Sequence, residues 1–318
     1  MSQSLREGRA WLTCIGACCL SAGGWAAVAE PEWLPPDLPP LQADGPTLCP
    51  RNYLTPEQGQ ALLDATLRAF PSLDDWRGYA NVVRARIQAG AGLEPWPQRT
   101  PLRPRRHSRR EFDGYSVEAV AFESLPGFYV TGNLYRPTTA AGRSRPAILS
   151  THGHTPAPRA PGDYERHGRF TEYAQIRAAA LARLGAVVLS IDMFGYGDSI
   201  VQVGAEAHRT PLAMRVQLWN AIRALDFLTT LDEVDPAQIA VTGESGGATQ
   251  ALLLTAVDPR VAVSVPVVMV SSYFFGGCPC ESGRPIHRSS KHFASNAVIA
   301  ALAAPRPMLV ISDGKDWT

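Results

Sequence analysis

The sequence has almost no net charge, and this argues against two classes of partner. Its 30 lysines and arginines are balanced by 29 aspartates and glutamates, which leaves a net charge of +1. Nucleic acids and anionic membranes are bound by surfaces with a clear excess of basic residues. One basic run, residues 99–110, holds six arginines but no interleaved aromatic residue. We therefore expect a solvated, poorly ordered connector there, and no nucleic-acid partner.

Long hydrophobic runs are also missing. The apolar run at residues 11–20 follows Arg6 and Arg9 and is shorter than the roughly 20 residues that a bilayer core requires. Small residues follow it as far as Ala29, so residues 1–29 are predicted to be a secretory signal peptide. A lipoprotein site at Cys18 is the minor alternative, since it would leave an apolar region of only about seven residues. The prediction is a secreted or periplasmic protein with no stable membrane anchor.

Cysteine is scarce in the predicted mature chain. Three cysteines would leave with the signal peptide, and Cys49, Cys278 and Cys280 remain. This odd number fits one disulfide from Cys49 to Cys278 or Cys280, with the third thiol unpaired. Zinc bound by Cys278, Cys280, His287 and His292 is an alternative, but the Cys-x-Cys spacing departs from the usual zinc pair. We therefore expect no metal and no cofactor.

The chain divides into an extension and one catalytic domain. With 318 residues, of which 45% are hydrophobic, it can bury a large core. Residues 30–110 begin with a proline-rich lead-in and continue with apolar positions at helical spacing, which predict two helices separated by Pro71. Residues 111–318 form the predicted catalytic domain.

From residue 111 onward, β-rich and helical segments alternate. Residues 115–122 and 128–135 predict an antiparallel hairpin. Further strands are predicted at 147–151, 186–191, 239–242, 261–270 and 308–312. Helices are predicted at about 172–184, 211–231, 247–256 and 290–303. This order predicts an α/β fold with a mostly parallel central sheet and helices on both faces.

The most informative motif is Gly-x-Ser-x-Gly around Ser245, placed between a predicted strand and a predicted helix. This pattern is typical of a nucleophile elbow, a strained turn that needs residues with almost no side chain around the serine. Gly243, Gly246 and Gly247 satisfy that need. Ser245 is therefore the predicted nucleophile.

A nucleophilic serine also needs donors for a developing oxyanion. One backbone N–H is expected from Gly246 and a second from the His-Gly-His turn after the strand at 147–151, at Gly153 or His154. A plain turn with solvent-facing histidines is the alternative. Asp192 and Asp198 lie in a glycine-rich turn after the next strand, and we expect them to stabilise loops.

Taken in order, these motifs resemble the α/β-hydrolase superfamily over residues 115–318. Within it, the chain is similar to exported bacterial acetyl xylan esterases and related carbohydrate esterases, a similarity that residues 276–281 share. The resemblance implies a serine esterase that cleaves carboxylic esters, of carbohydrates in particular, through an acyl-enzyme on Ser245. A small-molecule or carbohydrate ester is the expected partner. A serine peptidase of the prolyl oligopeptidase type and a non-catalytic hydrolase-fold binding protein are the alternatives.

The resemblance also implies an acid and then a histidine after the serine. Asp316 fits the acid turn that follows the strand at 308–312, with Glu281 as the alternative and Asp313 as a weaker one. Only Trp317 and Thr318 follow Asp316, so the histidine is expected beyond residue 318. His287 and His292 precede the acid and are expected to serve surface or packing roles. We therefore expect a C-terminally truncated hydrolase that lacks its last strand and helix and has weak activity or none.

Overall fold

The computed structural model describes residues 54–138, 144–155, 167–276, 278, 280–281, 284–289 and 292–313. The predicted signal peptide, Cys49 and Asp316 lie outside these residues. Within them, none of the helices combines the length and the apolar character that a bilayer span requires.

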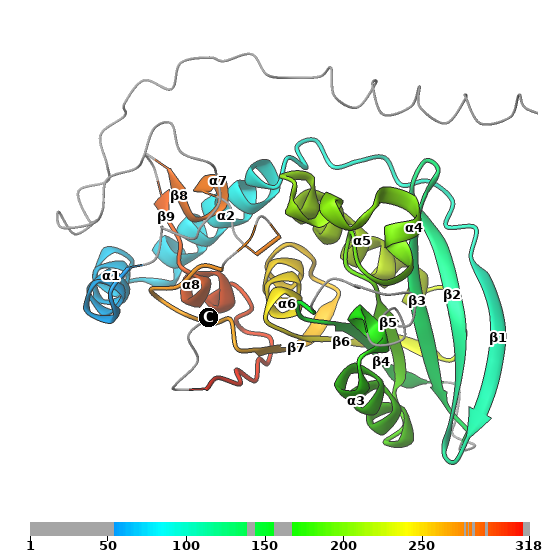
Figure 1. Ribbon diagram of the computed structural model, residues 1–318. Helices are drawn as coiled ribbons and strands as arrows, with labels where there is room; N and C mark the ends of the chain where they lie inside the picture. The colour runs from blue at the N-terminus through cyan, green and yellow to red at the C-terminus, as the bar shows by residue number, and fades with distance from the viewer. Residues whose placement is uncertain are drawn as a thin grey trace, which may run out of the picture.

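A seven-stranded mixed sheet forms the centre of the fold (Figure 1). Its strands are β1 (Arg105–Phe112), β2 (Tyr115–Leu125), β3 (Phe128–Pro137), β4 (Arg145–Thr151), β5 (Val187–Ile191), β6 (Val234–Glu244) and β7 (Val261–Val267). They lie in the order β1-β2-β3-β5-β4-β6-β7. Strands β5, β4, β6 and β7 are parallel neighbours, whereas β1, β2 and β3 form an antiparallel meander that joins them through β5. The predicted hairpin and parallel strands are confirmed.

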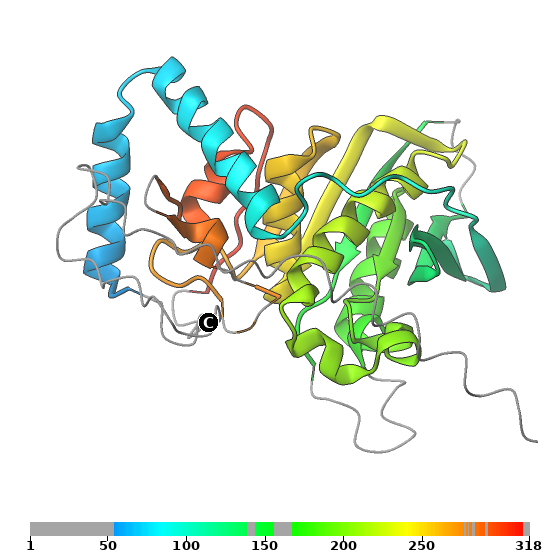
Figure 2. The same cartoon turned by 90° about the horizontal axis from the view of Figure 1, so that it is seen from above.

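Helices cover both faces of this sheet (Figure 2). Helix α3 (Glu172–Arg183) packs on one face, and α5 (Leu212–Leu228) and α6 (Gly246–Val257) pack on the other. Successive residues of a strand point to opposite faces. Accordingly, Ile148 and Val188 contact the alanines of α3, while Leu149 and Leu189 belong to the main core with α5 and α6. The α/β-hydrolase arrangement predicted from the sequence is thus present.

The N-terminal extension contributes two helices that pack on the sheet domain. These are α1 (Pro56–Ala69) and α2 (Leu73–Gly90), each with a side-chain N-cap, from Thr55 and Ser72. Arg84 of α2 donates to the carbonyl oxygens of Ala256 and Leu302 at 3.1 Å. Side-chain caps satisfy amide groups that a helix start would otherwise leave without partners. The two helices therefore begin at defined caps, and Arg84 holds α2 against the sheet domain.

The prediction of a poorly ordered basic connector at residues 99–110 is partly wrong. Its second half forms β1, an edge strand whose residues are all exposed. The backbone pairs with β2 while the arginine side chains stay in solvent. Charged residues are a common feature of edge strands because they discourage further pairing. Because β1 has no alternation of apolar and polar residues, the sequence pattern did not predict it as a strand.

Short elements complete the described chain. They are η3 (Gly168–Phe170), η4 (Gly197–Ser199), α4 (Ile200–Val203), η5 (Ala205–Arg209), α7 (Arg284–His287), β8 (Arg288–Ser289), β9 (His292–Phe293) and α8 (Asn296–Ala301).

The C-terminal part of the described chain differs in detail from the prediction. The helix predicted over 290–303 begins only at Asn296, because the hydroxyl of Ser295 caps it there. The predicted strand at 308–312 lies parallel to β7 through two bridges, Ser264 to Met308 and Val267 to Ile311.

Candidate active site

Ser245 lies on a tight turn between β6 and α6. Its backbone has φ 52° and ψ −120°, a conformation that a non-glycine residue adopts only under constraint. A Cβ added at Gly243 would lie 2.6 Å from the backbone carbon of Gly247, and one added at Gly247 would lie 2.7 Å from the His152 carbonyl oxygen. Both glycines are therefore required by close backbone packing. The predicted nucleophile elbow has the expected geometry.

The turn at residues 152–154 lies directly beside the elbow. A Cβ added at Gly153 would lie 3.4 Å from the Cβ of Ser245. However, the Gly153 N–H donates to Glu244 Oε1 at 2.6 Å, so it is already engaged. In the described part of the chain, no acceptor is assigned to the N–H groups of His154 and Gly246. Of the three amides predicted as oxyanion donors, only that of Gly153 thus has an assigned acceptor among the described residues.

His152 does not face solvent, in contrast to the plain-turn alternative. Its ring is fully buried, with Nδ1 at 2.8 Å from the Gly153 carbonyl oxygen and Nε2 accepting from the Met193 N–H at 3.1 Å. A carbonyl only accepts, so Nδ1 carries the proton. Burial lowers the pKa of His152 to about 3. The neutral ring thus ties the turn to the end of β5.

Glu281 is the carboxylate that the structure places at the serine. Ser245 Oγ donates to Glu281 Oε1 at 3.4 Å, and His154 Nδ1 lies 3.1 Å from the same oxygen. The Glu281 side chain is only 7% exposed. Asp313 lies on an exposed segment, and Asp316 falls outside the described residues. The acid ranked second from the sequence is therefore the one seen beside Ser245.

No histidine is assigned as a partner of Ser245 Oγ among the described residues. His287 is buried, with Nδ1 at 2.8 Å from the Ala294 carbonyl oxygen and its ring 4.9 Å from that of Phe275. This agrees with the packing role expected for it. His292 lies in β9. The histidine expected beyond residue 318 stays a prediction.

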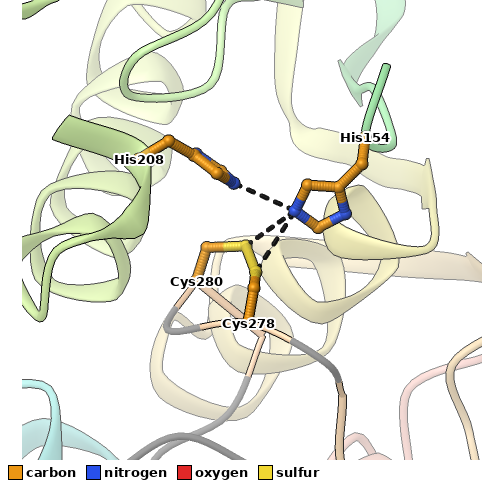
Figure 3. Close-up of side chains that lie close together, drawn as sticks. All are labelled: His154, His208, Cys278 and Cys280. Atoms are coloured by element: carbon orange, nitrogen blue, oxygen red, sulfur yellow. Dashed lines mark hydrogen bonds between the residues drawn. A yellow bond between two sulfur atoms is a disulfide. The ribbon is translucent and has the colours of Figure 1, made fainter. Parts of the chain in front are cut away.

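Two histidines and two cysteines gather at one place, as Figure 3 shows. The contact between His154 and Glu281 puts this cluster next to Glu281. His154 Nε2 lies 2.9 Å from His208 Nε2, 3.1 Å from Cys280 Sγ and 3.2 Å from Cys278 Sγ. Burial lowers the pKa of His208 to about 4, so its ring is neutral at pH 7. No motif singled out His208, which lies on the short helix η5.

The disulfide predicted between Cys49 and Cys278 or Cys280 is corrected by the structure. The bond joins Cys278 to Cys280, whose Cα atoms are 5.4 Å apart, within the usual range for a disulfide. The two cysteines are two residues apart in the sequence and lie close enough to pair within one turn. A pairing over so short a separation was not predicted from the sequence.

Asp192 and Asp198 hold the loops around the site, as expected. Both carboxylates pair with the guanidinium of Arg169, which is 2% exposed and comes from η3. Asp192 also accepts from Thr131 Oγ1 at 2.7 Å. No sequence motif pointed to Arg169 as their common partner.

Comparison with known proteins shows which proteins this chain is similar to. Residues 102–275 match the family model described as acetyl xylan esterase (AXE1). The putative hydrolase YtaP of Bacillus subtilis (strain 168) is 26% identical over 214 residues, covering 59% of this chain and 64% of YtaP. The chain thus spans less than two thirds of that relative.

Two solved structures are also similar to this chain. Methylesterase BT1017 is 37% identical, with a TM-score of 0.73, over 84% of this chain and 58% of that one. A putative acetyl xylan esterase from Bacteroides fragilis is 17% identical, with a TM-score of 0.55, over 79% of this chain and 74% of that one. The second likeness shows the fold alone.

Proposed function

Because the chain belongs to the acetyl xylan esterase family, we propose that it is a serine hydrolase that cleaves carboxylic esters of carbohydrates through an acyl-enzyme on Ser245. The observation that carries this proposal is the strained elbow at Ser245, with the amides of Gly246 and His154 beside it. A nucleophile and preorganised donors on one turn are what acyl transfer needs.

In the proposed reaction, Ser245 Oγ attacks the ester carbonyl carbon while a general base takes its proton, and the base later gives that proton to the departing alcohol oxygen. The carbonyl oxygen gains negative charge and is stabilised by the N–H groups of Gly246 and His154. The alcohol then leaves, and water hydrolyses the acyl-enzyme. Gly153 supports the hole indirectly, because its N–H holds the Glu244 side chain.

The general base is proposed to be a histidine oriented by a carboxylate. Asp316 is the acid that the sequence motif supports, and Glu281 is the acid that the contact with Ser245 Oγ supports. The variants Asp316→Asn and Glu281→Gln distinguish the two. In a longer chain that supplies the predicted histidine, loss of the orienting acid should lower the rate by about 10⁴-fold, whereas the other variant should lower it far less.

Labelling with a fluorophosphonate probe tests the nucleophile directly. We expect the probe to modify Ser245. The label should be absent in Ser245→Ala and retained in Ser144→Ala, which removes an exposed serine elsewhere. In a longer chain that supplies the predicted histidine, the absence of an adduct at Ser245 would favour the non-catalytic binding protein instead. The label reports the nucleophile even where turnover is slow.

The substrate class is tested by the released product. Acetylated xylo-oligosaccharides should release acetate, because the family model is that of acetyl xylan esterases. A methyl-esterified sugar acid that releases methanol instead would place the carbohydrate on the acyl side, in line with the name of the 37% identical methylesterase. Faster cleavage of an aminoacyl-proline substrate than of either ester would refute the esterase assignment.

A further inference from the structure

Four side chains with metal-ligating atoms converge from three separate segments. His154 follows β4, His208 lies on η5, and Cys278 and Cys280 follow β7 (Figure 3). Their two imidazole nitrogens and two sulfurs all lie within 4.8 Å of one another. Proximity of this kind, between residues so far apart in sequence, is set by the fold.

The hydrogen bonds of the two rings show which nitrogens carry protons. His208 Nδ1 lies 2.7 Å from the Phe194 carbonyl oxygen, and His154 Nδ1 lies 3.1 Å from the Glu281 carboxylate. Both partners accept, so both Nδ1 atoms carry hydrogen. In neutral rings the two Nε2 atoms then present lone pairs to each other at 2.9 Å. Facing lone pairs repel, and either a proton shared between the two nitrogens or a metal cation bound to both relieves the repulsion.

We propose that His154, His208, Cys278 and Cys280 form a Zn²⁺ site when the two cysteines are reduced. Two imidazoles and two thiolates are a common ligand set of structural zinc, with Zn–N of about 2.0 Å and Zn–S of about 2.3 Å. In a tetrahedron these bonds place donor atoms roughly 3.3 to 3.8 Å apart. The donor distances of 2.9, 3.1 and 3.2 Å around His154 Nε2 lie just below that range, and the two sulfurs have to move apart after reduction to reach it.

The surroundings match those of known zinc ligands. A ligating histidine usually donates its second N–H to a carboxylate or a backbone carbonyl, which fixes the ring and its tautomer. His154 has the carboxylate of Glu281 and His208 has the carbonyl of Phe194. Four protein ligands leave no open position, so the zinc has a structural role. Through His154 it would position Glu281, and hence the loop beside Ser245.

The disulfide and the zinc site are alternative states of the same two cysteines. A dithiol reductant supplies two electrons and two protons, which convert the Cys278–Cys280 bond into two thiols while the reductant becomes a disulfide. Zinc then replaces the two thiol protons, which pass to solvent. Binding therefore requires reduction and should weaken at low pH.

Metal binding to the full chain tests the proposal without any activity assay. The chain is purified in a dithiol reductant, dialysed against Zn²⁺ and analysed for metal, and a parallel sample is loaded with Co²⁺ alone. We expect one zinc per chain, and a cobalt spectrum with the intense visible bands of tetrahedral coordination and thiolate-to-cobalt charge transfer. Oxidised chain should show neither.

Variants with verified circular dichroism separate the ligands from other metal-binding groups. His208→Ala should lower zinc affinity by at least about 100-fold, and Cys280→Ser should weaken the thiolate-to-cobalt charge transfer, because only the Cys278 thiolate remains. His107→Ala, which removes an exposed histidine of β1, should leave both unchanged. A reduced, folded wild type without stoichiometric zinc, or equal binding by oxidised chain or by His208→Ala, would overturn the site. Ser245→Ala should still bind zinc, so failure of the esterase proposal would leave this result intact.

Discussion

Replacing Arg169 by methionine should destabilise the fold strongly, because it leaves a buried carboxylate without its cation. Arg169 is 2% exposed and the Asp192 side chain is 0% exposed. Removal of one partner of a buried ion pair costs about 3 to 5 kcal/mol. Asp192 keeps the hydrogen bonds from Thr131 Oγ1 and from the Asp198 N–H, which offset part of the loss. We therefore expect a decrease of about 3 kcal/mol in the free energy of unfolding.

Urea unfolding followed by circular dichroism measures this loss. Arg77→Met is the matched control, since its partner Asp74 is 89% exposed and surface pairs contribute about 0 to 1 kcal/mol. The double variant Arg169→Met with Asp192→Asn removes the uncompensated charge and should recover part of the stability. A loss below about 1 kcal/mol in Arg169→Met, or a double variant no more stable than the single one, would refute the argument.

Three further predictions concern Gly243, Gly78 and His152. Gly243→Ala should lower stability by about 1 to 3 kcal/mol in urea unfolding, because the added Cβ would meet backbone at 2.6 Å; a neutral effect would contradict the tight elbow. Gly78→Ala should raise it by about 0.5 to 1 kcal/mol, because Gly78 lies inside α2 with open space around it; a loss in unfolding free energy would contradict this. His152 has a folded pKa of about 3 against an ordinary 6.5, so the unfolded chain binds more protons between these values. Its stabilising effect is complete above pH 6.5 and is lost as the pH falls, by up to about 1.4 kcal/mol per pH unit. His152→Gln should therefore show a shallower decline between pH 6.5 and 4 in urea titrations, while His107→Gln should follow the wild type.

Local patterns in the sequence determined most of the architecture. The alternation at 115–135 predicts the hairpin of β2 and β3, and the Gly-x-Ser-x-Gly motif predicts the elbow at Ser245. Such features depend on residues within a few positions of one another, so their spacing alone predicts them. Strand β1 was not predicted, because an exposed edge strand has no apolar residues at a regular spacing.

The composition of the site was decided by tertiary structure. His154 is 54 residues from His208 and 126 from Cys280, yet their ring nitrogen and sulfur atoms lie about 3 Å apart. Glu281 reaches Ser245 for the same reason, since β6 and β7 are adjacent parallel strands whose carboxyl ends meet at one edge of the sheet. Arg169 likewise meets Asp192 only after η3 is folded against the end of β5. Sequence spacing carries no information about such contacts, because the order of strands in the sheet, rather than their order in the chain, brings these loops together.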